Sequence, residues 1–145
     1  IDFSASMCAQ VQRKIRSERL PNVAVSQGDI DTLPFANDSV DVLLCIDTLH
    51  HVPDESISAS LQEFQRVLRV GGLLLIDFKN KRNPYVSYSH KKRNRITYYR
   101  TNRTLRQVNV QLEKAGFSYM QCQGVPCAPA ALAPYVVVVG KKGKN

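Results

Sequence analysis

Two short runs of almost unbroken apolar residues restrict the fold of this 145-residue chain most strongly. They are VDVLLCI at residues 40–46 and LLLIDF at residues 73–78, and each is about as long as one strand. A strand that is apolar at nearly every position is expected to be buried on both faces, which is typical of a parallel sheet covered by helices. The sequence therefore predicts a layered α/β fold with a mostly parallel sheet and helices on both of its faces.

Helical and extended patterns also precede these runs. Met7, Val11 and Ile15 recur every four residues, which predicts an amphipathic helix over residues 6–20 with Ser4 or Ser6 as its N-cap. The β-branched run at 23–27 predicts a short strand. Residues 28–39, rich in Gly, Pro, Asn and Asp, predict a turn-rich loop.

The alternation of strand and helix continues to the end of the chain. Residues 48–54 are expected to form a loop ending at Asp54, the N-cap of a helix that Gly71 and Gly72 terminate. Another helix is expected over residues 101–117, and strands at 118–123 and 135–142. The predicted inward-facing residues are Ile57, Leu61, Phe64 and Leu68 in the first of these helices and Leu105, Val108 and Leu112 in the second. Residues 1–145 are expected to form a single domain.

The positive charge of the chain is concentrated in one segment. The formal net charge is +8, and no Asp or Glu lies between Asp77 and Glu113. Ten basic residues lie in that interval: Lys79, Lys81, Arg82, Lys91, Lys92, Arg93, Arg95, Arg100, Arg103 and Arg106. Residues 79–101, which also carry Tyr85, Tyr88, Tyr98 and Tyr99, form a long insert without clear periodicity. This basic-aromatic insert is expected to attract an anionic partner.

Polar residues follow several of the apolar runs. In open α/β sheets, ligands bind beyond the carboxyl ends of the strands, so these residues are candidates for a binding site. They are Asp2, Gly28 to Ile30, Asp47 to His51, and Asp77 with Phe78. Carboxylates are acceptors only, and a diol offers two donors, so such a pocket suits the hydroxyl and amino groups of a nucleoside.

Five stretches, in this order, resemble a known family. They are IDFSASMCAQ (1–10), VSQGDIDTLPFANDSVDVLLCIDTLHHVPD (25–54), EFQRVLRVGGLLLIDF (63–78), LEKAGF (112–117) and YVVVVGKK (135–142). They are similar to consecutive motifs of class I S-adenosylmethionine-dependent methyltransferases, and most closely to the group that includes quinone-biosynthesis methyltransferases. The resemblance implies a Rossmann-like fold, S-adenosylmethionine as cofactor and methyl transfer as activity.

The resemblance also implies roles for individual residues. Asp2 would accept hydrogen bonds from the ribose hydroxyls, and Phe3 would lie near the adenine. Asp29 would bind the adenine amino group, with the backbone N–H of Ile30 on a ring nitrogen. Asp47, Thr48 and Leu49 would border the methionine part of the cofactor. His50 and His51 would lie where the acceptor and the cofactor meet.

Each assignment has a structural alternative. Asp2 fits a helix cap, and Asp29 fits a turn residue. His50 and His51 are candidates for a catalytic base, but adjacent side chains on an extended segment point in opposite directions, so only one is expected to face a ligand. Neither is expected to bind a metal, because no third ligand has suitable spacing.

The chain departs from the family pattern at its start. Family members begin with a strand and a glycine-rich turn, where the absence of a Cβ lets the backbone approach the cofactor. The sequence thus resembles a methyltransferase domain without its first strand and first helix. Three explanations remain open: a retained part of a longer protein, a truncated gene, or a homo-oligomer in which another copy covers the unpaired edge.

Three functions are compatible with the sequence. The first is methyl transfer to a small-molecule acceptor that is anionic or resembles a phenol, a quinone or a lipid. The second is methylation of a nucleic acid, because basic and aromatic residues together bind phosphates and stack on bases. The third is a non-catalytic remnant of the fold that acts as an interaction protein.

Two further expectations concern the cellular setting. No apolar run approaches the roughly 20 residues that cross a bilayer, and no leader is evident, so the default expectation is a cytoplasmic protein without a membrane span. The four cysteines, Cys8, Cys45, Cys122 and Cys127, show no zinc spacing and are expected to be reduced and unpaired.

Overall fold

The computed structural model describes residues 1–93, 102–125, 129–130 and 133–143. Cys127 and part of the predicted insert, including Tyr98 and Tyr99, lie outside the described residues. The chain divides into two compact units, Ile1–Phe35 and Ala36–Asn145, which are described separately.

The first unit contains one helix, α1 (Ala5–Ser17), which begins as the sequence predicts. Ser4 is its N-cap, and the Ser4 hydroxyl accepts a hydrogen bond from the backbone N–H of Met7. Ile15 is the buried residue of the helix. The strand predicted at 23–27 is wrong, because that segment makes only a single bridge, from Gln27 to Asp2. One paired residue does not extend into a ladder.

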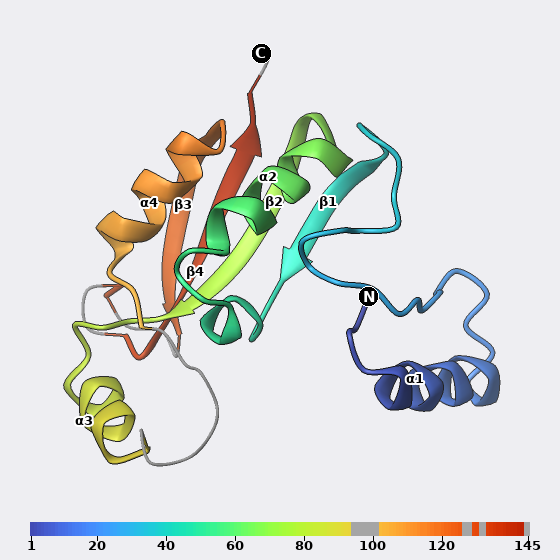
Figure 1. Ribbon diagram of the computed structural model, residues 1–145, viewed down its shortest axis with the longest axis horizontal. Coiled ribbons are helices and arrows are strands. Elements are labelled where there is room, and N and C mark those ends of the chain that lie inside the picture. The colour runs from blue at the N-terminus through green and yellow to red at the C-terminus, as the bar shows by residue number, and fades with distance from the viewer. Residues whose placement is uncertain (94–101, 126–128, 131–132, 144–145) are drawn as a thin grey trace. The chain divides into compact units, whose positions relative to one another are not determined.

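The second unit is built on a four-stranded sheet in the order β1-β2-β4-β3 (Figure 1). Strand β1 (Val40–Cys45) runs parallel to β2 (Leu68–Lys79). Strand β4 (Tyr135–Lys142) is antiparallel both to β2 and to β3 (Phe117–Val125). The α/β fold class is confirmed, with a mixed sheet in place of the mostly parallel one expected. No helix separates β3 from β4 among the described residues, so their connection favours antiparallel pairing.

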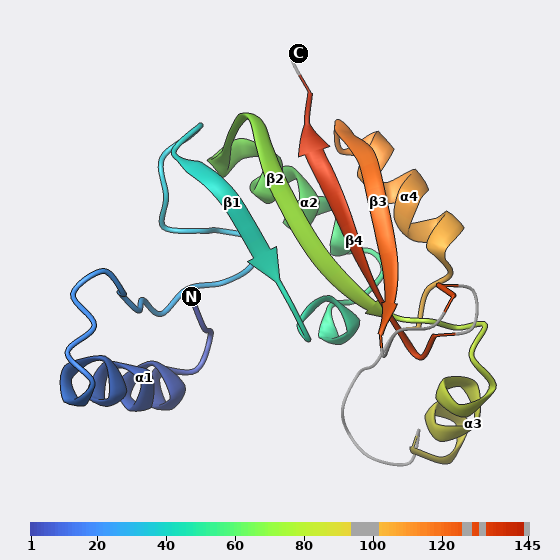
Figure 2. The ribbon, with the colours of Figure 1, turned by 180° about the vertical axis from the view of Figure 1, so that it is seen from behind.

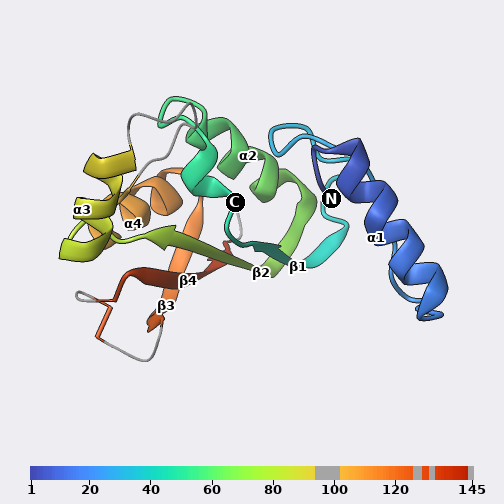
Figure 3. The same ribbon diagram turned by 90° about the horizontal axis from the view of Figure 1, so that it is seen from below.

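Helices α2 (Ile57–Val67) and α4 (Leu105–Lys114) lie against one face of this sheet, and the opposite face is turned toward the viewer in Figure 2. Figure 3 shows the helices and the strands as two layers. The core between them contains fully buried side chains from both layers, chiefly Leu61, Phe64, Leu112, Leu74, Val136 and Val138. Both helices therefore bury the apolar faces that their periodicity predicts.

Strand β1 is less buried than its composition suggests. It lies at the edge of the described sheet, and its residue Leu44 is 64% exposed. In β2, Leu74 and Ile76 face the helices and are buried, whereas Leu73 and Leu75 are only half-buried. The prediction that these strands are buried on both faces is wrong within residues 36–145, because α2 and α4 share one face.

Two predicted helix boundaries also differ. Helix α2 ends at Val67, and the chain continues directly into β2 at Leu68, so Gly71 and Gly72 lie in the strand. Ser56, not Asp54, occupies the N-cap position of α2. The insert contains a helix that the sequence did not predict, α3 (Pro84–Arg93). The side chain of Asn83, the residue before this helix, accepts a hydrogen bond from the N–H of Val86.

Candidate functional site

In the first unit, the chain brings Asp2 beside residues 26–28. The backbone N–H of Asp2 donates to the carbonyl of Ser26 at 3.3 Å, and the N–H of Gly28 donates to the carbonyl of Asp2 at 3.1 Å. The side chain of Gln27 donates to the carbonyl of Phe3 at 3.0 Å. Two segments that are far apart in the sequence are therefore held side by side, and the predicted residues Asp2, Phe3 and Asp29 lie at their ends.

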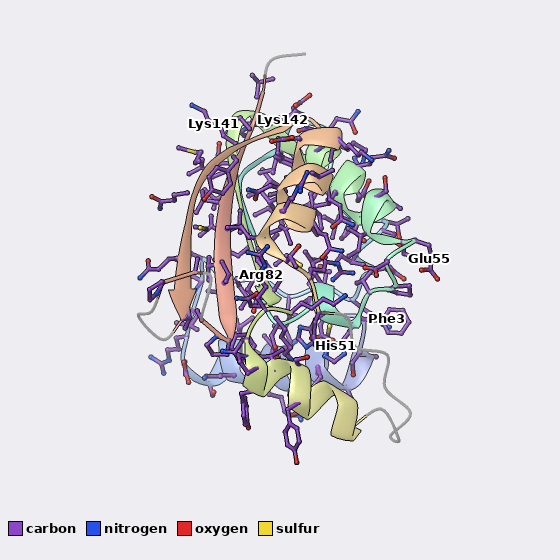
Figure 4. The ribbon with its side chains drawn as sticks, turned by 90° about the vertical axis from the view of Figure 1, so that its left-hand side faces the viewer. Phe3, His51, Glu55, Arg82, Lys141 and Lys142 are labelled. Atoms are coloured by element: carbon purple, nitrogen blue, oxygen red, sulfur yellow. The ribbon has the colours of Figure 1, made fainter. Side chains whose placement is uncertain are left out.

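The carboxylate of Asp2 holds the start of the chain in a tight turn. Its Oδ1 accepts from the N–H of Ser4 at 2.8 Å, while no partner is found for Oδ2 among the described residues. Asp2 is not the cap of α1, since Ser4 has that role. The ring of Phe3 extends away from the backbone and leaves the residue 75% exposed (Figure 4).

Asp29 serves as a turn residue, one of the two alternatives for it. Its Oδ1 accepts from the N–H of Asp31 at 3.2 Å, and its carbonyl accepts from the N–H of Thr32, also at 3.2 Å. Asp29 is exposed and Ile30 is half-buried. Because a carboxylate has about four acceptor sites, the single bond to Asp31 leaves Asp29 able to bind a ligand as well.

In the second unit, the predicted residues 47–51 form a tight turn at the end of β1. Asp47 has a φ of 53°, and its N–H donates to the Oδ1 of Asp77 on β2 at 2.8 Å. The hydroxyl of Thr48 donates to the carbonyl of Ile46 at 2.9 Å. Leu49–His51 then form a 3-10 helix where the sequence predicted a loop. Backbone and side-chain bonds thus fix this whole segment, which we call the histidine turn (residues 47–54).

The two histidines of this turn differ in exposure. His50 is 1% exposed and its Nε2 lies 3.6 Å from the Oδ1 of Asp47, whereas His51 is exposed. Their ring centroids are 4.0 Å apart, so the prediction that the two rings point in opposite directions is wrong. The segment is a 3-10 helix and not extended, so successive side chains are about 120° apart and not on opposite sides. His51 is therefore the histidine that can reach a ligand (Figure 4).

Arg103 is a residue of this region that the sequence analysis did not single out. Its guanidinium is buried and donates to the carbonyls of Leu49 at 3.1 Å and Val52 at 3.3 Å. It also donates to the Oδ1 of Asp54 at 2.6 Å. In the sequence, Arg103 is one of ten basic residues in a segment that contains no Asp or Glu, and nothing distinguishes it from the others.

Three of the four cysteines lie in the described part of the chain. Cys8, Cys45 and Cys122 are free, as predicted. Burial raises the pKa of the Cys45 thiol to about 12, so this thiol is protonated at neutral pH and acts as an apolar core residue. Among the described residues, no cluster of three or more His, Cys, Asp or Glu side chains is arranged to hold a metal ion.

Asp77 supports the histidine turn at a cost in stability. Burial raises the pKa of its carboxyl above the ordinary value of 3.8, and the neighbouring Asp47 carboxylate raises it further. Because the folded state binds this proton more tightly than the unfolded state, ionisation of Asp77 lowers the free energy of unfolding as the pH rises above 3.8.

We therefore expect Asp77→Asn, which keeps an oxygen for the N–H of Asp47, to be more stable than the wild type at pH 7 by about 1 kcal/mol. The advantage should shrink as the pH falls toward 4, in urea unfolding measured across that range. Asp77→Ala removes the oxygen and should be less stable than Asp77→Asn at every pH. An advantage that does not change with pH would contradict the expectation.

Comparison with known proteins indicates a family for part of the chain. Residues 1–72 match the family model described as "Methyltransferase domain". Over these residues, the chain is similar to the class I S-adenosylmethionine-dependent methyltransferases. Their cofactor, S-adenosylmethionine, is therefore the one against which the site residues are to be judged. The match includes every predicted site residue from Asp2 to His51.

The chain spans only part of the length of its sequence relatives. The uncharacterized protein YafE of Escherichia coli is 33% identical over 75 residues, which are 52% of this chain and 35% of YafE. A demethylmenaquinone methyltransferase of Halalkalibacterium halodurans is 36% identical over 72 residues, which are 50% of this chain and 29% of that enzyme. The matched region thus spans about a third of each relative.

The fold match extends over the whole chain. The crystal structure of the YcgJ protein from Bacillus subtilis aligns with a TM-score of 0.78 at 18% identity, covering 99% of this chain and 81% of that chain. The Rossmann-like fold therefore includes the part of the chain beyond residue 72. No helix among the described residues is long and apolar enough to span a membrane.

Proposed function

We propose that this methyltransferase binds S-adenosylmethionine and transfers its methyl group to a small-molecule acceptor. The observation that carries the proposal is the pairing of Asp2 with residues 26–28, which presents two carboxylates, Asp2 and Asp29, from one compact unit. The Oδ2 of Asp2 has no partner within the part of the chain that the structure describes, and a carboxylate oxygen can accept a hydrogen bond from a ribose hydroxyl. The donor and acceptor chemistry of this unit fits an adenosine.

The individual roles follow the chemistry of each side chain. Asp2 accepts hydrogen bonds from the ribose, Asp29 accepts from the adenine amino group, and the N–H of Ile30 donates to a ring nitrogen. Phe3 offers an exposed aromatic ring for the adenine face. Asp47, Thr48 and Leu49 are assigned to the methionine end of the cofactor.

The chemistry requires orientation more than activation. When bound, S-adenosylmethionine would supply an electrophilic methyl group on its sulfonium, with S-adenosylhomocysteine as the leaving group. The chain holds the acceptor in place and excludes water, which by itself accounts for much of the rate of such a reaction. Of the two candidate bases, the exposed His51 is assigned as the proton acceptor, and the buried His50 packs against its ring.

The small-molecule acceptor is supported by two observations. The relative from Halalkalibacterium halodurans is named a demethylmenaquinone methyltransferase, and a quinone is a small molecule. Tyr85 and Tyr88 on α3 are exposed, as are Lys81 and Arg82 just before that helix, and this combination of aromatic and cationic residues suits an anionic and partly apolar compound. A nucleic acid would use the same surface, and it would bind with a steep dependence on salt concentration.

Calorimetric titration with S-adenosylhomocysteine tests the cofactor assignment. Asp2→Ala is expected to weaken binding about tenfold or more, because it removes a charge-assisted hydrogen bond. Glu18→Ala, which removes an exposed carboxylate of the same unit, is the matched control and should leave the affinity unchanged. Absence of binding by the folded wild type, or equal affinities for wild type and Asp2→Ala, would contradict the proposal.

A further inference from the structure

Arg103 is a buried cation whose two terminal nitrogens donate to the histidine turn. Its side chain is 5% exposed, and it reaches three oxygens of the histidine turn: the carbonyls of Leu49 and Val52 and the carboxylate of Asp54. These partners are 49 to 54 residues away in the sequence. A planar guanidinium fork is suited to several simultaneous acceptors, whereas a lysine ammonium is a point charge on a flexible stem.

The backbone of Arg103 is fixed as firmly as its side chain. Its N–H donates to the carbonyl of Lys79 at 3.1 Å, and its carbonyl accepts from the N–H of Lys81 at 3.0 Å. The next residue, Thr104, is the N-cap of α4 and forms a capping box with Gln107. Arg103 is therefore held on both sides, by the end of β2 and by the start of α4.

Asn80, which forms a β-bridge with Arg103, anchors the start of the insert. Its Nδ2 donates to the carbonyls of Ala130 and Ala133, each at 3.0 Å, and its Oδ1 accepts from the N–H of Arg82, also at 3.0 Å. Asn80 is 3% exposed. The start of the basic-aromatic insert and the segment before α4 thus meet at the bridge between Asn80 and Arg103, and the side chain of Arg103 continues from that bridge into the histidine turn.

We propose that Arg103 is a positioning residue that couples the basic-aromatic insert to the histidine turn. This inference rests on the proposed function, in which the insert receives the acceptor and the turn borders the methyl group. The side chain of Arg103 binds the carbonyls of Leu49 and Val52, and its backbone binds Lys79 and Lys81. A ligand that orders the histidine turn is therefore expected to order residues 79–83 as well. Arg103 does not itself contact the reacting atoms.

Amide hydrogen exchange of two segments, 47–54 and 79–83, tests the coupling. In the unliganded protein, Arg103→Gln is expected to speed exchange in residues 49–54 about tenfold, since the turn loses three bonds. Arg103→Lys should give an intermediate effect, because one ammonium replaces only part of the fork. Unchanged exchange at 49–54 in Arg103→Gln would overturn the proposal.

The response to S-adenosylhomocysteine separates coupling from a purely structural role. In the wild type, the ligand should slow exchange in both segments. In Arg103→Gln it should slow exchange in the turn and no longer in residues 79–83. Continued protection of residues 79–83 in that variant would overturn the coupling. If the wild type shows no response in either segment, the proposed function fails, and the unliganded comparison alone decides the role of Arg103.

A second variant keeps the test decisive if Arg103→Gln does not fold. Asp54→Asn keeps an oxygen beside the guanidinium but removes the charge, and Asp54 has a 65% exposed side chain, so folding should be retained. We expect exchange in residues 52–54 to rise by about threefold and ligand protection of residues 79–83 to weaken. No change in either quantity would count against the coupling.

Discussion

Lys142→Met is expected to lower the free energy of unfolding by about 2–4 kcal/mol, because the substitution removes the ammonium donor from one buried and one partly buried carbonyl oxygen. The ammonium of Lys142, on β4, donates to the carbonyls of Gln65 at 2.7 Å and Leu68 at 2.8 Å, and to Asp38 at 2.8 Å. All three of its protons are used. The two carbonyls lie where α2 ends and β2 begins, so the lysine closes the helix with a positive charge at its C-terminus.

Neighbouring substitutions show which of these contacts matters. Lys141 is the adjacent residue on β4 and is exposed, and Lys141→Met should change stability by no more than about 0.5 kcal/mol (Figure 4). Asp38→Ala should cost at most about 1 kcal/mol, because the carboxylate is 58% exposed and the two carbonyl bonds remain. Urea unfolding of the three variants measures the differences. Similar losses for Lys142→Met and Lys141→Met would show that the buried contacts contribute nothing.

The apolar pattern of the sequence predicted the scaffold well. The helical periods at Met7, Val11 and Ile15 and at Ile57, Leu61 and Phe64 correspond to α1 and α2. The runs at 40–46, 73–78, 118–123 and 135–142 each lie on or overlap a strand. These features depend on local alternation of apolar and polar side chains, which a single sequence shows directly.

The polar contacts that position the site were not predictable in the same way. In the sequence, nothing distinguishes Arg103, Lys142 and Asn80 from ordinary surface residues. In the structure each is buried and forms a hydrogen bond with a residue more than 50 positions away. Burial of a cation depends on which distant carbonyls converge on it, and that is a property of the tertiary structure. The family resemblance placed Asp2, Asp29 and the histidine turn, but not their supports.

The two adjacent glycines show how a sequence signal can predict a backbone conformation correctly but assign it to the wrong element. Gly71 and Gly72 were predicted to terminate a helix, because a residue with positive φ commonly follows a helix end. Gly71 does have a φ of 81°, but it lies in β2. Val40 pairs with Leu68 and Val42 with Leu73, so β2 uses four residues where β1 uses one. The glycines form this irregularity, which lets the chain pass directly from α2 into the sheet.

Gly72→Ala is therefore expected to destabilise the protein by about 1–3 kcal/mol, by overpacking. A Cβ at this position would lie 2.9 Å from the carbonyl oxygen of Arg69 and 3.0 Å from that of Asp41. Both are backbone atoms, so neither can rotate away, and β1 would have to shift relative to β2. Thermal unfolding monitored by circular dichroism should show the loss as a lower Tm.

Gly140→Ala, on β4, is the matched control for this substitution. A Cβ at Gly140 would meet its nearest neighbour, the Cβ of Phe117, at 3.5 Å, which is an ordinary contact. The change should therefore be within about 0.5 kcal/mol, or slightly stabilising, because alanine restricts the unfolded chain. Equal stability of Gly72→Ala and Gly140→Ala would mean that β1 and β2 have room to separate. The histidine turn depends on that pairing, since Asp47 follows β1 and its partner Asp77 lies on β2.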